Sequence, residues 1–209
     1  MVITQNKIIK WLVTYADILN ENKTYLTELD SEIGDADHGI NMDRGFQAVI
    51  KNLHENREAD IGTILKTTAM ALISSVGGAS GPLYGTLFLE MSRCTEGKVE
   101  LSKIEWTAAL EAGVKGVAKR GKAFAGDKTM LDALLPAVKA LKEGTYGTEE
   151  LPLALQSAYK AAEQGMKDTI QMVAKKGRAS YLGERSAGHQ DPGATSSFLM
   201  LKAASEALV

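Results

Sequence analysis

Apolar residues recur every three or four positions along most of the chain, which is the spacing of one face of an α-helix. The first such face consists of Ile8, Leu12, Tyr15, Ala16 and Leu19. Three similar faces follow, at Tyr25, Leu26, Leu29 and Ile33, at Met42, Phe46, Val49, Ile50 and Leu53, and at Leu65, Ala69, Leu72, Ile73 and Val76. No segment keeps the period-two alternation of a half-buried strand. The pattern predicts an all-α fold of about eight helices.

Two helix starts are marked by their residue types. Ser102 and Glu105 have the spacing of a capping box, in which each side chain accepts a backbone N–H of the other residue. The helix that they open is expected to run to about Gly121. Asp191 and Pro192 are typical of an N-cap followed by a first-turn proline, and they predict a last helix that reaches the C-terminus.

Two further helices are expected in the second half of the chain. One follows Thr129 and should stop at Gly144. Pro136 lies inside it and predicts a kink or an early break, because proline removes a backbone donor. The longest helix is expected to run from about Leu151 to Lys176.

Size and charge limit the classes of protein to consider. The chain has 209 residues, enough for one substantial core, and residues 1–209 are expected to form a single domain. Its 24 basic and 26 acidic residues give a net charge of −2, without the basic excess that is typical of nucleic-acid binding. Cys94 is the only cysteine, so no intrachain disulfide is expected, which fits a cytoplasmic setting.

One uncharged segment resembles a membrane span. Residues 67–89 carry no charged side chain, but they include glycines 77, 78, 81 and 85 and Pro82. We expect two buried helix ends around a glycine-rich joint, and no contact with a membrane. The N-terminus also lacks the long apolar core of a signal peptide.

The strongest chemical signal is a cluster of acidic residues. No basic residue lies between Lys23 and Arg44, whereas Asp30, Asp35 and Asp37 lie close together there. We expect their charge to be balanced from elsewhere, and Mg²⁺ suits a few carboxylates combined with phosphate oxygens and water. A solvated acidic turn is the alternative. An EF-hand is excluded, because the twelfth position counted from Asp35 is Phe46, where that loop requires Glu.

Three other stretches are candidate contacts for an anion. The glycine-rich residues 77–85 precede a helix start, whose free N–H groups suit an anion, although tight helix packing explains them as well. Arg178 follows Gly177 and could bind a phosphate, or simply follow a helix C-cap. Residues 190–194 also fit a plain N-cap. Residues 116–123 are not a P-loop, since Ala123 replaces the Ser or Thr that binds magnesium.

Residues 121–129 are expected to form a loop that could cover a ligand. Among the three histidines, His38 is the candidate functional residue, because it adjoins Asp37. His54 and His189 are expected on the surface or in loops.

Three of these motifs together carry a resemblance to a known family. They are residues 34–41 (Gly-Asp-Ala-Asp-His-Gly-Ile-Asn), 77–82 (Gly-Gly-Ala-Ser-Gly-Pro) and 191–194 (Asp-Pro-Gly-Ala). In this order they resemble the nucleotide-binding L subunits of bacterial dihydroxyacetone kinases, and the resemblance extends over the whole chain. It implies a barrel of eight antiparallel amphipathic helices with the nucleotide site at one end.

The resemblance also implies roles for particular residues. Asp30, Asp35 and Asp37 are similar to the ligands of two magnesium ions. Arg178 is similar to a catalytic group that balances charge on the transferred phosphoryl group. The implied nucleotide contacts are His38, Gly39, Ile40, Asn41, Ala79, Ser80, Gly121, Met130, Arg178, Asp191, Pro192 and Gly193.

The implied activity is phosphoryl transfer with ADP/ATP as a tightly bound coenzyme. A phosphotransferase-system protein would recharge the ADP in place, and the phosphoryl group would then pass to dihydroxyacetone on a partner subunit. One alternative is the nucleotide-binding domain of an ATP-dependent dihydroxyacetone or fatty-acid kinase, for whose other domains this chain has no room. The other is a nucleotide-dependent partner of a transcription regulator.

Overall fold

The computed structural model describes residues 2–55 and 58–209, with His54 and Glu55 described by their backbone alone. Nine α-helices lie within these residues: α1 (Gln5–Glu21), α2 (Lys23–Ile33), α3 (His38–Glu55), α4 (Ile61–Ser75), α5 (Ser80–Cys94), α6 (Lys103–Gly121), α7 (Met130–Tyr146), α8 (Leu151–Asp168) and α9 (Pro192–Ala207). Two 3₁₀ segments, η1 (Thr169–Gln171) and η2 (Arg178–Ser186), connect α8 to α9. The strands β1 (Ile3–Thr4) and β2 (Glu100–Leu101) form a short antiparallel pair. The prediction of a mostly helical chain is confirmed.

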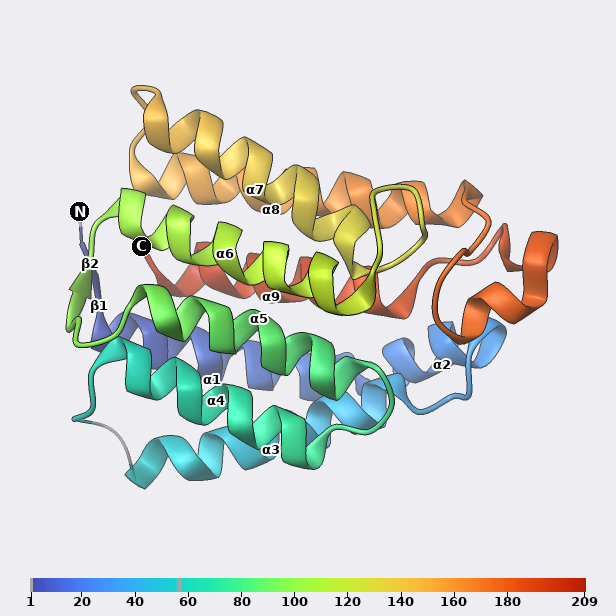
Figure 1. Cartoon of the computed structure of the whole chain (residues 1–209), viewed down its shortest axis with the longest axis horizontal. Coiled ribbons are helices and arrows are strands. Elements are labelled where there is room, and N and C mark those ends of the chain that lie inside the picture. Colours follow the sequence, from blue (N-terminus) through green and yellow to red (C-terminus); the bar gives the residue numbers. More distant parts are fainter. Residues whose placement is uncertain (1, 56–57) are drawn as a thin grey trace.

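The long helices lie side by side and pack in a cycle (Figure 1). Each helix from α3 to α8 contacts the next one along the chain. Helix α1 contacts both α3 and α9. The short helix α2 packs on α3 and lies at one end of the molecule, whereas β1, β2 and both termini lie at the other end (Figure 1).

A single large apolar cluster fills the space between these helices. Aromatic rings from four helices meet there. Trp11 of α1 lies edge-on to Trp106 of α6, with ring centroids 5.1 Å apart, and Tyr15 lies 4.5 Å from Phe46 of α3. Phe88 of α5 contacts Trp11 and Phe46. The side chains that repeat at helical spacing in the sequence therefore supply this core, although Tyr25 and Ile73 are wrongly predicted and are 44% and 43% exposed.

The predicted helix starts are confirmed. Ser102 and Glu105 form a reciprocal capping box at α6. Asp191 caps α9 and accepts the backbone N–H of Ala194 at 2.7 Å. Residues 67–89 divide into the end of α4 and the start of α5, as expected. No helix in the described part of the chain is long and apolar enough to cross a membrane.

Two predictions for the second half of the chain are wrong. The early break predicted at Pro136 is wrong, because α7 continues to Tyr146. The alternative, a kink at Pro136, stays a prediction. Pro136 has no N–H to donate to the carbonyl of Asp132, one turn earlier in α7. This carbonyl faces Gly165 of α8, where a Cβ would lie 1.9 Å from the carbonyl oxygen. Gly165 therefore lets α8 pack closely against the proline turn.

Helix α8 also ends earlier than predicted, at Asp168. The hydroxyl of Thr169 donates to the Met166 carbonyl at 2.6 Å, and the Thr169 carbonyl accepts the Lys128 ammonium at 2.5 Å. Carbonyl groups at the end of α8 thus find their hydrogen-bond donors in Thr169 and in Lys128, which is distant in the sequence. Among the described helices the longest is α6, with 19 residues.

Candidate functional site

A cavity of about 390 Å³ opens at the end of the molecule that carries α2. Its wall is built from the end of α2, the start of α5, the loop between α6 and α7, the start of η2 and the start of α9. These segments meet at the right of Figure 1. The volume falls in the usual range for a small-molecule site.

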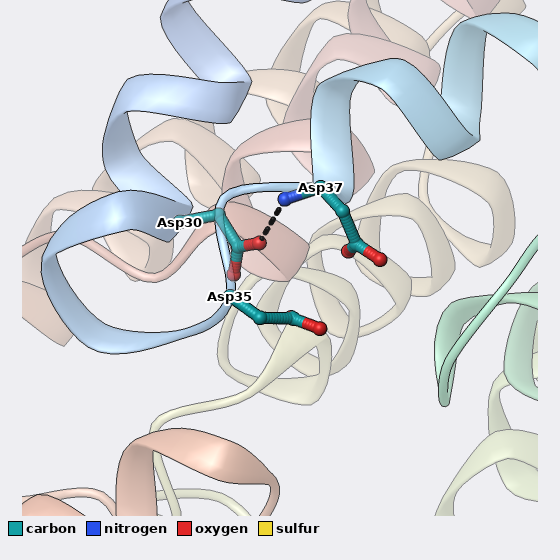
Figure 2. Close-up of side chains that lie close together, drawn as sticks. All are labelled: Asp30, Asp35 and Asp37. Atoms are coloured by element: carbon teal, nitrogen blue, oxygen red, sulfur yellow. Dashed lines mark hydrogen bonds between the residues drawn. The ribbon is translucent and has the colours of Figure 1, made fainter.

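Three carboxylates converge on one side of this cavity. Asp30 comes from the last turn of α2, Asp35 from the following loop, and Asp37 directly precedes α3 (Figure 2). Each offers an oxygen within 4.8 Å of the others. All three line the cavity.

The backbone around Asp30 fixes this convergence. Asp30 Oδ2 accepts the N–H groups of Asp37 at 2.9 Å and His38 at 3.1 Å. These donors lie at the start of α3, where the helix dipole favours negative charge. A Cβ at Gly34 would lie 2.0 Å from Asp30 Oδ1, so only glycine fits there. Ala36 turns the chain with a positive φ of 59°.

The charge of this stretch is partly balanced by side chains. Arg178 forms an ion pair with Asp35 at 2.8 Å, and Lys23 forms one with Asp43 at 2.8 Å. The first pair balances Asp35 from a distant part of the chain, as expected, whereas the second lies outside the cluster of Asp30, Asp35 and Asp37. Within the described residues, no ion pair joins a Lys or Arg to Asp30 or Asp37. A bound cation would supply the positive partner that these two carboxylates lack there.

His38 lies beside the carboxylates as a buried, neutral ring. Burial lowers the pKa of His38 to about 4, although Asp30 and Asp37 act in the opposite direction. Its Nδ1 lies 3.2 Å from Ser80 Oγ and its Nε2 lies 2.9 Å from Ser196 Oγ. The ring is therefore uncharged at neutral pH. Each of its two nitrogens has a serine hydroxyl within hydrogen-bond distance.

The start of α5 faces the same cavity. Gly77, Gly78, Ala79 and Ser80 line the wall, and Ala79 caps the helix without a side-chain hydrogen bond. Free N–H groups at a helix start favour an anion. This geometry suits the phosphates expected there.

Opposite charges lie together on the α9 side of the cavity. Burial raises the pKa of Asp191 to about 7, while the Ala194 N–H and Lys128 act to lower it. Lys128 is 1% exposed and donates to the carbonyls of Thr169 and His189, both at 2.5 Å. Burial lowers the pKa of Lys128, against the pull of Asp191 and Asp132. This cation ties the loop before α7 to the segment before α9.

The structure brings most of the predicted site residues to this one cavity. On its wall lie Asp30, Asp35, Asp37, His38, Ala79, Ser80, Gly121, Met130, Arg178, Asp191, Pro192 and Gly193. The loop 121–129, expected to cover a ligand, contributes residues 121, 123, 128 and 129.

Three predicted nucleotide contacts are not among the lining residues. Gly39 packs against α2, where a Cβ would lie 2.0 Å from the Lys23 carbonyl. Ile40 is 46% exposed. Asn41 is buried and accepts from Arg44 at 2.7 Å. These residues shape the first turn of α3 behind His38.

Several lining residues were not predicted individually. Leu83, Lys128 and Thr129 lie in stretches that the sequence analysis named as candidate contacts or as a covering loop, whereas Val117, Arg120 and Lys176 lie outside these stretches. The capping-box spacing of Thr129 and Asp132 could have been recognised, but no local signal marks Lys128 as buried. His189 is partly exposed and lies 3.5 Å from Glu32, while the side chain of His54 lies outside the described residues.

Comparisons with known proteins identify the family. The DAK2 domain model matches residues 32–206. The chain is 48% identical over 202 residues to the Escherichia coli "PEP-dependent dihydroxyacetone kinase, ADP-binding subunit DhaL", covering 97% of this chain and 96% of that protein. It is 41% identical to the Lactococcus lactis "PTS-dependent dihydroxyacetone kinase, ADP-binding subunit DhaL", covering 93% of each.

A solved structure is also similar. It is the dihydroxyacetone kinase of C. freundii in complex with AMP-PNP and Mg²⁺, with a TM-score of 0.70 and 27% identity. The match covers 95% of this chain and 33% of the C. freundii chain. This chain thus spans about a third of the length of that solved kinase.

Proposed function

The chain belongs to the DAK2-domain family, and on that premise we propose that it is the ADP-binding subunit of a PEP-dependent dihydroxyacetone kinase. The relatives with that name match it over almost their whole length. The observation that carries the proposal is the convergence of Asp30, Asp35 and Asp37 on one wall of a cavity that also holds a helix start and Arg178.

Asp30, Asp35 and Asp37 would hold magnesium, with two ions as the proposed number. Their oxygens are the hard ligands that Mg²⁺ prefers, and three carboxylates leave room for phosphate and water oxygens. Asp30 Oδ2 is already occupied by two backbone N–H groups. Asp30 would therefore use its other oxygen, Oδ1, which Gly34 leaves accessible.

The nucleotide would lie along the cavity from the carboxylates to α9. Its phosphates would lie near His38, Ala79 and Ser80, where the start of α5 offers N–H groups. The nucleoside would contact Gly121 and Met130 and the turn at Asp191, Pro192 and Gly193. All of these residues line the same wall.

Catalysis would come from charge balance and alignment, since phosphoryl transfer needs little covalent chemistry from the protein. Bound Mg²⁺ would neutralise the phosphate oxygens. Arg178 is the proposed catalytic residue. Its side chain is 65% exposed and pairs with Asp35, so when Asp35 binds metal the guanidinium is free to contact the phosphoryl group. A cation at that point would stabilise the charge of the transition state.

The names of the relatives support a proposal for the partner proteins and the location of this chain. We propose that a phosphotransferase-system protein recharges the bound ADP and that a dihydroxyacetone-binding subunit receives the phosphoryl group, in the cytoplasm. We further propose that residues 1–209 form one nucleotide-binding domain and that the cycle of helices is the barrel implied by the resemblance. An interaction with a transcription regulator stays a prediction of that resemblance.

The test is a reconstituted transfer assay. The purified chain with Mg²⁺, ATP and dihydroxyacetone should form no dihydroxyacetone phosphate, because the triose needs a positioning pocket on the partner subunit. Product should appear when that subunit and the phosphorylated donor protein are added. Arg178→Ala should slow this transfer without unfolding the chain.

Rapid turnover by the chain alone would contradict the proposal. That result would favour the alternative of a self-sufficient ATP-dependent kinase. Equal rates for wild type and Arg178→Ala, in the complete system, would contradict the role proposed for Arg178.

A further inference from the structure

A buried polar chain leads from the cavity into the core. It begins at Ser80 and passes through His38 to Ser196 of α9. Tyr84 of α5 lies 2.7 Å from Ser196 Oγ and 3.0 Å from Ser197 Oγ. His38, Ser196 and Tyr84 are 6%, 0% and 1% exposed. Three of these groups have no place in the site proposed above: Ser196, Ser197 and the Tyr84 hydroxyl.

The hydrogens of this chain can be placed by counting donors at Ser196. Its Oγ has three neighbours: His38 Nε2 at 2.9 Å, the Tyr84 hydroxyl at 2.7 Å and the Gly193 carbonyl at 3.1 Å. A hydroxyl has one hydrogen and two lone pairs, and a carbonyl can only accept. When all three contacts are hydrogen bonds at once, the Ser196 hydrogen goes to Gly193, and Tyr84 and His38 both donate to Ser196.

This arrangement selects one tautomer of the neutral His38 ring. Its ring hydrogen lies on Nε2, so Nδ1 carries the lone pair and accepts the hydroxyl hydrogen of Ser80, 3.2 Å away. The hydrogen bond at one imidazole nitrogen decides the state of the other. The acceptor nitrogen is thus the one on the cavity side of the ring.

We propose that Ser196, held by Tyr84, is a positioning residue for His38. It keeps the ring in one orientation with Nε2–H directed into the core and the Nδ1 acceptor directed at Ser80 and the cavity. The inference rests on the proposed function, in which His38 and Ser80 lie near the phosphates. It adds that Ser196 of α9, 158 residues further along the chain, determines which of His38 and Ser80 donates their shared hydrogen bond.

The first test needs no ligand and no change at Ser196. ¹⁵N NMR of the histidine-labelled chain reports which ring nitrogen carries hydrogen, and His38→Gln identifies the signal. Wild-type His38 should carry its hydrogen on Nε2 at neutral pH. A His38 signal with the hydrogen on Nδ1 would overturn the proposal even if every Ser196 variant failed to fold.

The second test compares two neighbouring serines. Ser196 and Ser197 are both fully buried in α9 and both contact Tyr84, but only Ser196 contacts His38. Ser196→Ala should move the hydrogen toward Nδ1, where Ser80 can accept it, and weaken ADP binding with Mg²⁺ about tenfold, the effect of about one hydrogen bond. Ser197→Ala should keep the wild-type tautomer and affinity. Ser196→Thr, which restores a hydroxyl, should recover the tautomer.

An unchanged His38 tautomer in folded Ser196→Ala would overturn the proposal, as would an equal loss of affinity in Ser197→Ala. Failure of the proposed function is distinguishable, because wild type would then not bind ADP with Mg²⁺ at all. The tautomer of the ligand-free chain would still decide whether Ser196 positions His38.

Discussion

Asp30 is a buried carboxylate that has backbone N–H partners but no Lys or Arg partner among the described residues. Burying a charge is costly unless it is hydrogen-bonded. Here two backbone N–H groups at the start of α3 stabilise one oxygen, and Gly34 leaves space beside the other. The fold thus holds this carboxyl group in one place at the cavity wall, where a divalent cation would bind its other oxygen.

Asp37→Asn should weaken magnesium-dependent ADP binding at least about tenfold, since even outer-shell partners of metal ligands typically contribute about 10–100-fold. The helices should remain, because the Asp30 carboxylate bonds the backbone of residue 37 and not its side chain. Calorimetric titration measures the affinity and circular dichroism the helix content.

Asp17→Asn is the matched control, since Asp17 is exposed on α1. It removes the same charge away from the cavity and should bind as wild type does. Equal affinities for Asp37→Asn and Asp17→Asn would show that Asp37 is not a metal ligand.

Asp191 should make stability depend on pH near neutrality. Burial raises its pKa from 3.8 to about 7 in the folded chain, so the folded state binds more protons than the unfolded state between these values. The contribution of Asp191 to the free energy of unfolding therefore falls as pH rises from about 4 to 7. Asp191→Asn, which still caps α9, should gain stability relative to wild type between pH 5 and pH 8.

Denaturant unfolding with chelator and without nucleotide measures this difference. Asp60→Asn is the control, because Asp60 caps α4 but its pKa is lowered, mainly by the Thr63 hydroxyl. Its titration lies below pH 5, so its difference from wild type should stay constant over the same range. A constant difference for Asp191→Asn as well would refute the raised pKa.

At the residue scale, the sequence predicted side chains whose neighbours are local. Asp30, Asp35 and Asp37 lie within eight residues, and their convergence follows from one glycine-containing loop. Lys128 could not be predicted, because its burial depends on carbonyls 41 and 61 residues away. A lysine in a polar loop gives no local sign of that contact.

Among the elements, the two capping boxes lie at opposite ends of the molecule. Ser102 starts α6 next to β2, at the end that carries the termini (Figure 1). Thr129 starts α7 and lines the cavity. The same local motif thus starts a core helix at one end of the molecule and orders the wall of the cavity at the other.

Ser102→Ala should lower the free energy of unfolding by about 1 kcal/mol, the usual contribution of an N-cap side chain, and leave ADP affinity unchanged. Thr129→Ala should cost about the same stability and should also weaken ADP binding, since this cap orders the loop at the cavity. Thermal unfolding and calorimetry of both variants check this. Equal ADP affinities in the two variants would contradict the role of the second cap.

At the scale of elements, starts were predicted more accurately than ends. The starts of α6 and α9 depend on side chains within three residues of each other. The end of α8 depends instead on Thr169 and Lys128, which meet only in the folded chain. The strands β1 and β2 also depend on tertiary pairing. With two residues each, they are too short to show an alternating pattern in the sequence.

The whole molecule separates its core from its site. Helices packed in a cycle supply a continuous apolar interior, and the segments between them gather the polar groups at one end (Figure 1). Residues from 30 to 193 meet there. The sequence predicted the helical class and, through the three motifs, the acidic, glycine-rich and α9 parts of the cavity wall, whereas the packing order of the helices required the structure.

The most direct test of the proposed coenzyme role follows the nucleotide itself. The purified chain is loaded with Mg²⁺ and ADP, incubated with the phosphorylated donor protein of the phosphotransferase system, and analysed by native mass spectrometry. The bound ADP should gain a phosphoryl group while it remains on the chain, and chelation of Mg²⁺ should prevent this. A nucleotide that stays ADP under these conditions, or that is phosphorylated only after release from the chain, would contradict the proposed function.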